Sequence, residues 1–277
     1  MKIFITGATG FVGTNLIEYY KDHEVFEHKR WMDVRAKLEY FRPDVIINCA
    51  AQIYDPADMW DCNVLWVQQC LEHVKEFCHT KMVQIGSSAE YGPMPRPSAE
   101  TDRINPVDMY QATKGASTLL CQGYARVYNL DISIARPYSV FGPHERPHRL
   151  FPRLWRALTY NQPMKLFHGV HDFIYIDDFV RGIDTLVQRN DKPLGDIVNF
   201  GSGCQYTNAE VLAAFETVAG SKLPVELVDT MAKVYESEVW TCDTTYAQQK
   251  YGFKIEYDLE AGIKKFLETA YYEQEKI

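Results

Sequence analysis

The sequence predicts an α/β protein, built as a Rossmann-like doubly wound parallel sheet with a smaller C-terminal lobe. Short apolar runs alternate with amphipathic stretches over the first half of the chain, a pattern typical of parallel strands covered by helices on both faces. A glycine-rich turn joins the first run to the first helical stretch, as dinucleotide-binding sheets require. After Arg136 the rhythm changes, because proline and glycine become frequent and the elements become irregular.

The apolar runs and helical stretches can be taken in chain order. Strands are expected at 2–6, 24–28, 44–48, 81–85 and 131–135, and helices at 11–20, 58–78 and 108–128. In the second half, 198–203 has the pattern of a strand end and turn, and helices are expected at 208–219 and 259–272. We therefore expect a dinucleotide-binding domain at 1–136 and a mainly substrate-binding lobe at 137–277, interleaved with the first.

Composition narrows the classes of function. The chain has 277 residues, a formal net charge of −8 and seven cysteines. The acidic balance argues against a nucleic-acid partner, which needs basic patches, and the apolar runs are too short to cross a bilayer. An odd cysteine count without a Cys-x-x-Cys pair favours buried thiols over disulfides or a metal site. We expect a cytoplasmic protein without nucleic-acid, membrane or metal partners.

A glycine-rich turn follows the first expected strand and opens the first helix. Its glycines are spaced three residues apart. Glycine allows a tight turn and a close approach of backbone N–H groups to a pyrophosphate, and the helix N-terminus adds unpaired donors. The turn therefore predicts dinucleotide binding by Gly7, Thr9, Gly10, Phe11, Val12 and Gly13.

The end of the second expected strand should read the 2′ position of the adenosine ribose. An acid there accepts from a free hydroxyl, whereas basic groups favour a phosphate. Lys29 and Arg30 stand at this place and favour NADP(H), while Glu27 keeps NAD(H) open. An ordinary pair of exposed charges after a strand would look the same.

A tyrosine and a lysine four residues apart open the helix expected at 108–128. Tyr110 and Lys114 share one helix face, so a fixed positive charge can favour the phenolate of a tyrosine that ordinarily keeps its proton to about pH 10. Ser87 follows the strand at 81–85, where open parallel sheets place ligands, and could stabilise charge on a reacting oxygen. We expect all three to be catalytic, with Tyr110 and Lys114 also contacting the cofactor.

These motifs, in this order, resemble the NAD-dependent epimerase/dehydratase group of extended short-chain dehydrogenase/reductases over nearly the whole chain. The Gly-x-x-Gly-x-x-Gly spacing is similar to that of this group, and its usual acidic position after the second strand falls on Lys29. The resemblance implies further cofactor contacts at the adenine edge, on a strand end of small residues and beside the nicotinamide. The residues concerned are Asp33, Val34, Ala50, Ala51 and Pro137.

The resemblance also implies that the substrate is a nucleoside-diphosphate sugar, with a transient or supplied keto group, most often at C4. His171 stands where the family has the arginine of its Arg-Asp-Phe block, which puts one phosphate or sugar contact in doubt. Guanidinium groups match phosphate oxygens, so nearby arginines are candidates for the diphosphate. The expected substrate contacts are Ser88, Tyr138, Ser139, Arg146, Arg149, Arg153 and His171.

The residues after Ser87 help to separate the subfamilies. The 4,6-dehydratases of the family carry a glutamate two residues after the catalytic Ser/Thr, where this chain has Ala89. Glu90 comes one position later, and on an extended segment it would face the other way. Dehydration is therefore disfavoured, which leaves hydride transfer at one sugar carbon.

Two reactions of this kind remain open. The basic pair after the second strand favours a 4-keto-sugar reductase that uses NADP(H), and an NAD-dependent 4-epimerase is the alternative. A dinucleotide-sensing regulator on this fold would usually lack the Tyr/Lys pair. The helices expected at 58–78 and 108–128 resemble those that form a four-helix bundle in family dimers, which implies a homodimer.

Overall fold

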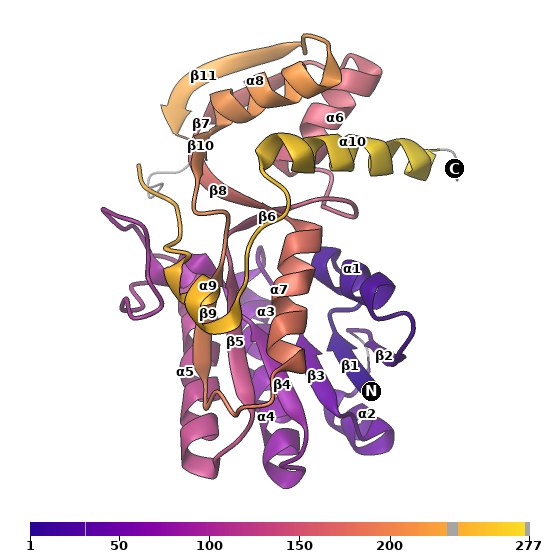
Figure 1. Ribbon diagram of the computed structural model, residues 1–277, viewed down its shortest axis with the longest axis vertical. Coiled ribbons are helices and arrows are strands. Elements are labelled where there is room, and N and C mark those ends of the chain that lie inside the picture. Colours follow the sequence, from indigo (N-terminus) through magenta and orange to yellow (C-terminus); the bar gives the residue numbers. More distant parts are fainter. Residues whose placement is uncertain (31, 232–237, 275–277) are drawn as a thin grey trace.

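The expected α/β architecture is confirmed by the computed structural model, which describes residues 1–30, 32–231 and 238–274. Six parallel strands form the central sheet in the order β2-β1-β3-β4-β5-β9 (Figure 1). Their bounds are Lys2–Thr6 (β1), Glu24–His28 (β2), Val45–Asn48 (β3), Lys81–Ile85 (β4), Ile132–Pro137 (β5) and Asp196–Phe200 (β9).

Helices cover both faces of this sheet. Ile3 and Ile5 of β1 pack into one apolar cluster, while Phe4 between them packs into the other, because successive strand residues point to opposite faces. Five helices supply the covering layers, two against the first cluster and three against the second. They are α1 (Phe11–Tyr19) and α7 (Ile176–Gln188), then α2 (Val34–Phe41), α4 (Trp66–Glu76) and α5 (Met109–Tyr128).

The helix expected at 58–78 has a different form. It consists of α3 (Pro56–Trp60), a π-helical turn η1 (Asp61–Leu65) and α4. The first segment starts two residues early because Asp55 caps it by accepting from the Ala57 N–H, and Pro56 occupies its first position. A π-helical turn adds a residue to the helical repeat, and such turns are frequent at functional sites.

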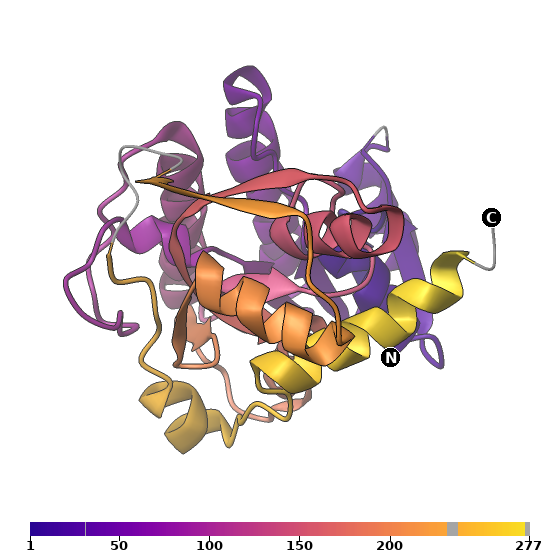
Figure 2. The ribbon, with the colours of Figure 1, turned by 90° about the horizontal axis from the view of Figure 1, so that it is seen from above.

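A smaller lobe lies beyond the carboxyl ends of the strands, at the top of Figure 1. Its described residues form a three-stranded sheet, a two-stranded parallel sheet and three helices, which are seen from above in Figure 2. Its elements are β6 (Ser139–Phe141), β8 (Val170–Tyr175) and β10 (Gln205–Thr207), β7 (Met164–His168) and β11 (Val225–Met231), and α6 (Leu150–Tyr160), α8 (Asn208–Ala219) and α10 (Leu259–Gln274). The helices expected at 208–219 and 259–272 are confirmed.

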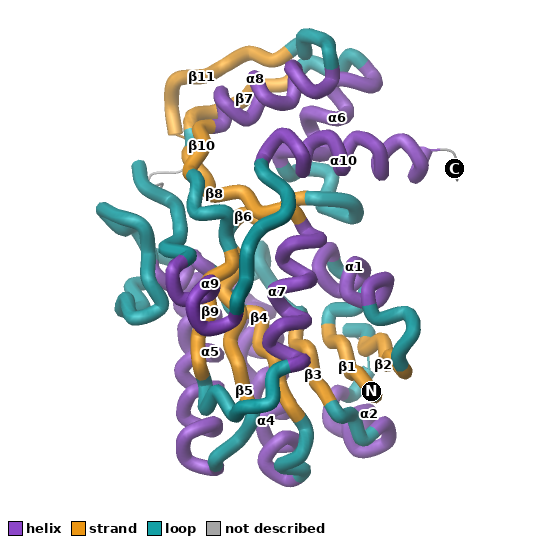
Figure 3. The backbone as a smooth tube through the Cα atoms, in the orientation of Figure 1, coloured by secondary structure: helices purple, strands orange, loops and turns teal. Residues whose placement is uncertain are grey.

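The chain passes repeatedly between the two lobes. Both β9 and α7 come after the predicted boundary at 136/137. Even so, β9 pairs with β5 and α7 packs against α1, so both belong to the main sheet and its covering helices. A short helix, α9 (Thr245–Tyr251), lies against β9, and the tube in Figure 3 shows the long loops that join these parts. The second half of the sequence therefore completes the central sheet as well as building the smaller lobe.

One buried carboxylate fastens the crossing segments together. Asp172 of β8 accepts hydrogen bonds from the backbone N–H groups of Ser202, Gly203 and Cys242, at 2.6, 3.0 and 3.1 Å. These donors belong to the turn after β9 and to the segment before α9. Asp172 thus holds the smaller lobe against the end of the main sheet.

None of the helices in the described part of the chain combines the length and the apolar character that a membrane-spanning helix needs.

Candidate active site

A cavity of about 440 Å³ opens at the carboxyl ends of the central strands, between the sheet and the smaller lobe. Ligand sites in open α/β sheets occur at this position, and the size suits a small-molecule ligand. Thirteen of the 23 predicted site residues line it. They are Phe11, Val12, Ala51, Ser87, Ser88, Tyr110, Lys114, Pro137, Tyr138, Ser139, Arg146, Arg149 and His171.

The glycine turn fits the pyrophosphate of a dinucleotide. Gly7 has φ of +64°, and a Cβ added there would lie 2.8 Å from the backbone nitrogen of Ala50. A Cβ on Gly13 would lie 2.3 Å from the carbonyl oxygen of Gly7. Helix α1 then starts at Phe11 with Gly10 as N-cap, and no side chain caps it. Its first-turn N–H groups therefore face the cavity edge as donors for an anion.

The expected 2′-ribose residues lie outside the lining of this cavity. Arg30 is exposed and forms an ion pair with Asp58 of α3, so its charge already has a counterion. Asp33 uses Oδ1 to cap α2, accepting from the Ala36 N–H at 2.9 Å. The side chain of Val34 is buried in the core beneath α2, which leaves only its backbone for an adenine.

The three expected catalytic side chains converge on the cavity. Lys114 is buried, and its ammonium donates to the carbonyl of Ile85 at the end of β4. Burial lowers the pKa of Lys114, and the nearby Glu90 charge opposes that change. Burial raises the pKa of Tyr110, while its hydrogen bond with Ser87 acts in the opposite direction.

Glu90 faces away from the cavity, as expected. The segment that carries it is not extended, however, and this part of the expectation is wrong. Residues Ser88–Tyr91 form a 3-10 turn, η2, for which Ser87 is the N-cap. The turn directs Ala89 to the cavity and Glu90 into the core. There the carboxylate accepts from Arg136 at 2.7 Å, from the Thr118 hydroxyl at 2.8 Å and from the Ser87 N–H at 2.8 Å.

The π-helical turn η1 positions a further polar contact. Asn63 is buried and accepts from the Gln52 N–H at 2.8 Å, while its amide donates to the Thr113 hydroxyl at 2.9 Å. Gln52 follows the small-residue end of β3, and Thr113 precedes Lys114 on α5. Asn63 therefore links the segment after β3, where a cofactor would lie, to α5, which carries Tyr110 and Lys114.

Of the substrate contacts expected in the smaller lobe, Arg146 and His171 line the cavity and Arg153 does not. Arg146 lies over the Tyr54 ring at 5.4 Å, and His171 lies 3.3 Å from the Ser139 hydroxyl. Arg153 does not belong to the cavity lining, because its guanidinium donates to the carbonyl of Lys165 at 2.8 Å. The expected substrate contact at Arg153 therefore finds no support in the geometry.

Tyr54 and Glu145 are two polar residues of the cavity lining that were not predicted from the sequence. Tyr54 follows the end of β3, and Glu145 lies in the loop between β6 and α6. Glu145 is paired with Arg149, whose Nε donates to Oε1 at 3.2 Å. The prolines on either side of Glu145 marked this loop as irregular, but no periodic pattern showed that the glutamate points inward.

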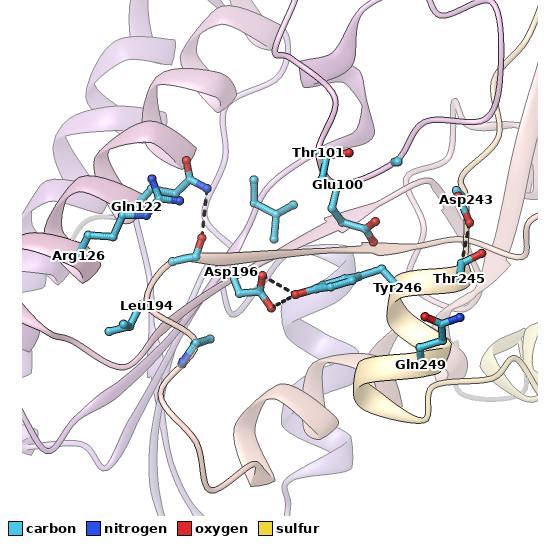
Figure 4. A pocket seen from close by; sticks show the side chains of 14 residues that line it. Glu100, Thr101, Gln122, Arg126, Leu194, Asp196, Asp243, Thr245, Tyr246 and Gln249 are labelled. Atoms are coloured by element: carbon cyan, nitrogen blue, oxygen red, sulfur yellow. Dashed lines mark hydrogen bonds between the residues drawn. The ribbon is translucent and has the colours of Figure 1, made fainter.

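A second hollow lies beside β9 and has a different character (Figure 4). Asp196 accepts from the hydroxyls of Tyr246 and Tyr251 and from the ammonium of Lys250, at 2.8, 2.6 and 2.7 Å. Because this carboxylate already has several donors, the residues here serve to hold α9 against the sheet.

A family model matches most of the chain. The NAD dependent epimerase/dehydratase family model covers residues 3–201, from β1 to the first residue after β9. The chain belongs to this family.

Relatives extend the match over nearly the full length. An uncharacterized UDP-glucose epimerase of Bacillus subtilis is 27% identical, over 98% of each chain. A UDP-glucuronate 4-epimerase of Thermodesulfobacterium geofontis is 30% identical, over 78% of this chain and 67% of its own.

Solved structures of family members share the fold. The dTDP-glucose 4,6-dehydratase of Bacillus anthracis, in complex with NAD, has a TM-score of 0.88 at 20% identity over 99% of this chain and 98% of its own. The UDP-glucose 4-epimerase of Thermotoga maritima has a TM-score of 0.88 at 20% identity over the whole of both chains. The protein is thus an enzyme of the NAD-dependent nucleotide-sugar epimerase/dehydratase family.

The Glu90–Arg136 pair allows a test of the site's foundation. Glu90→Gln should lower the free energy of unfolding by about 3–5 kcal/mol, because it leaves a buried guanidinium without its counterion. Urea unfolding followed by circular dichroism would measure the change.

Glu226→Gln is the matched control. Glu226 and Lys165 are both exposed and 3.8 Å apart, so its effect should stay below about 1 kcal/mol. Equal effects of the two substitutions would show that the buried pair does not hold the site together.

Proposed function

We propose that this protein is an NAD-dependent 4-epimerase of a nucleoside-diphosphate sugar. One observation carries the proposal. Ser87, Tyr110 and Lys114 line the same cavity as Phe11 and Val12 of the glycine turn. A phenol, an ammonium and a hydroxyl thus meet at the place where a dinucleotide would end, which suits reversible oxidation of a sugar hydroxyl.

The roles of the three residues follow from their chemistry. A dinucleotide held at the glycine turn would supply reversible hydride transfer at the sugar carbon, with return to the opposite face giving the epimer. Tyr110 takes the proton of the hydroxyl as the carbon is oxidised and gives it back as the carbon is reduced. Ser87 donates to the same sugar oxygen, and Lys114 supplies the fixed positive charge that lowers the cost of forming the phenolate.

The carboxylates near Ser87 favour epimerisation over dehydration. The family's dehydratases use a glutamate two residues after the catalytic Ser/Thr to eliminate water across two sugar carbons. Ala89 occupies the position where the family's dehydratases have a glutamate, and Glu90 is already bonded to Arg136, Thr118 and Ser87. The two epimerases among the relatives described above agree with this assignment.

The cofactor expectation changes as well. The preference for NADP(H) is not supported, because Arg30 is neutralised by Asp58 and several structural neighbours hold NAD. An epimerase also needs a cofactor that stays bound, since the same hydride is removed and returned. The 4-keto-sugar reductase remains as the second candidate, because Lys29 also follows β2, beside the expected ribose.

Tyr110→Phe tests the catalytic assignment. The variant should retain cofactor and bind substrate, while turnover of the nucleotide sugar falls by a factor of about 10³ or more, because the proton acceptor is lost. Interconversion of UDP-glucose and UDP-galactose, followed by chromatography, would measure it. Tyr40→Phe, on an exposed tyrosine of α2, is the control; a Tyr110→Phe rate equal to that of this control would refute the role of Tyr110.

The cofactor itself is open to direct identification. We expect the purified protein to release NAD on denaturation, seen by mass spectrometry, and to turn over substrate without added cofactor. An empty protein that consumes NADPH with a 4-keto sugar would instead establish the reductase. The double variant Lys29→Glu with Arg30→Ala should then weaken NADPH binding far more than NADH binding.

We also propose that the protein forms a homodimer through α5 and the η1–α4 region. Leu65 and Leu119 are exposed on these neighbouring elements, with 39% and 59% of their surface accessible, and large exposed apolar side chains in one region are typical of interfaces. A second copy of the chain is the occupant that the family resemblance implies.

Leu119→Asp tests this assembly, because it would place a charge in the apolar interface. The variant should sediment as a monomer at micromolar concentration, where the unmodified protein sediments as a dimer. Val127→Asp, on the exposed far end of α5, is the comparison that locates the interface along the helix. A monomeric unmodified protein would contradict the proposal.

A further inference from the structure

Glu145 is a buried carboxylate at the edge of the cavity that the reaction described above does not use. It lies on the loop between β6 and α6, and its side chain is only 4% exposed. It lines the cavity together with Tyr110 and Lys114. Oε1 accepts from Arg149, whereas Oε2 has no hydrogen-bond partner among the residues that the structure describes.

An unpaired carboxylate oxygen in a protein interior is costly, and such a group needs an explanation. Burial raises the pKa of Glu145 to about 7, and the positive charge of Arg149 opposes that rise. Above this pH the side chain is an acceptor only. A ligand that brings a hydroxyl donor to Oε2 would remove the cost, and the cavity is where a ligand would sit.

The Arg149 contact locates Glu145 relative to the reacting group. Arg149 is near enough to Tyr110 for its charge to lower the pKa of that phenol. The Glu145–Arg149 pair therefore lies close to the proposed reaction centre. Arg146, the neighbouring cation, is stacked over the Tyr54 ring.

We propose that Glu145 determines the class of sugar, by accepting a hydrogen bond from a hydroxyl of a neutral hexose and by excluding a hexuronate. The inference rests on the proposed nucleotide-sugar function. Two effects act in the same direction. The carboxylate would repel a second carboxylate, and it accepts from Nε of Arg149, a guanidinium that a hexuronate could otherwise use.

Both sugar classes occur among the similar proteins, so the distinction is a real choice within the fold. One relative is a UDP-glucuronate 4-epimerase, and one structural neighbour was solved with UDP-glucuronic acid as well as with UDP-glucose. The two sugars differ in charge at C6, so a charged side chain in the sugar pocket can distinguish them.

The test compares two ligands that share one nucleotide. Dissociation constants of UDP-glucose and UDP-glucuronic acid would be measured by calorimetry on the full-length, NAD-loaded protein at pH 8.5, where Glu145 is ionised. We expect UDP-glucose to bind at least about tenfold more tightly. Because both ligands carry the same nucleotide, their ratio does not depend on how well the site accepts uridine.

Three variants complete the design. Glu145→Gln should reduce the preference for UDP-glucose by about tenfold or more, mainly through tighter binding of UDP-glucuronic acid, because it releases Arg149. Glu145→Asp keeps the charge and should keep the sign of the preference. Glu226→Gln, on the exposed surface of β11, removes an equal charge and should change neither constant. Thermal unfolding of each variant would verify that it is folded.

The outcomes separate the two levels of the proposal. If the unmodified protein binds both ligands and Glu145→Gln leaves their ratio unchanged, the role of Glu145 is refuted and the proposed epimerase stands. A preference of the unmodified protein for UDP-glucuronic acid would refute it equally. If neither ligand binds the unmodified protein at millimolar concentration, the protein does not use UDP-glucose or UDP-glucuronic acid, and the selection between them that we assign to Glu145 is refuted.

Discussion

The buried ion pair between Glu90 and Arg136 is the constraint on which the rest of the site depends. Both side chains are fully shielded from solvent, and a charge in that environment is tolerated only when it is paired and hydrogen-bonded. The pair joins η2 to β5, while the Thr118 hydroxyl brings in α5. Since Glu90 also accepts from the Ser87 N–H, the same carboxylate sets the place of Ser87 beside Tyr110.

The hydrogen bonds of Glu90 also prevent this carboxylate from reacting with a ligand. With its lone pairs taken by three protein donors, Glu90 cannot act as an acid toward a ligand. Its position under the cavity floor also keeps a negative charge near Lys114, which offsets part of the cost of burying that ammonium. One buried carboxylate therefore supports the geometry of the site and the charge of the lysine at the same time.

The cavity brings together two parts of the chain with different tasks. The central sheet contributes the glycine turn and the Ser/Tyr/Lys group, held in place by regular strands and by α5. The smaller lobe contributes polar side chains that are paired with one another. Glu145 and Arg149 are paired on the loop before α6, and Ser139 and His171 are paired on β6 and β8. Rigid elements thus carry the chemistry that the family shares, and the loops carry the groups that can distinguish one sugar from another.

The sequence by itself determined the local features of this protein. The alternation of apolar runs gave the strands and helices of the sheet, and the glycine spacing and the i, i+4 pair at Tyr110 and Lys114 were visible because a few neighbouring residues fix those geometries. Only the tertiary structure decided the rest. It placed β9 in the main sheet, formed the π-helical turn around Asn63, bonded Arg153 to a carbonyl of β7, and directed Glu145 inward. Each of these depends on contacts between residues far apart in the chain, and the periodicity of side chains along a sequence does not indicate such partners.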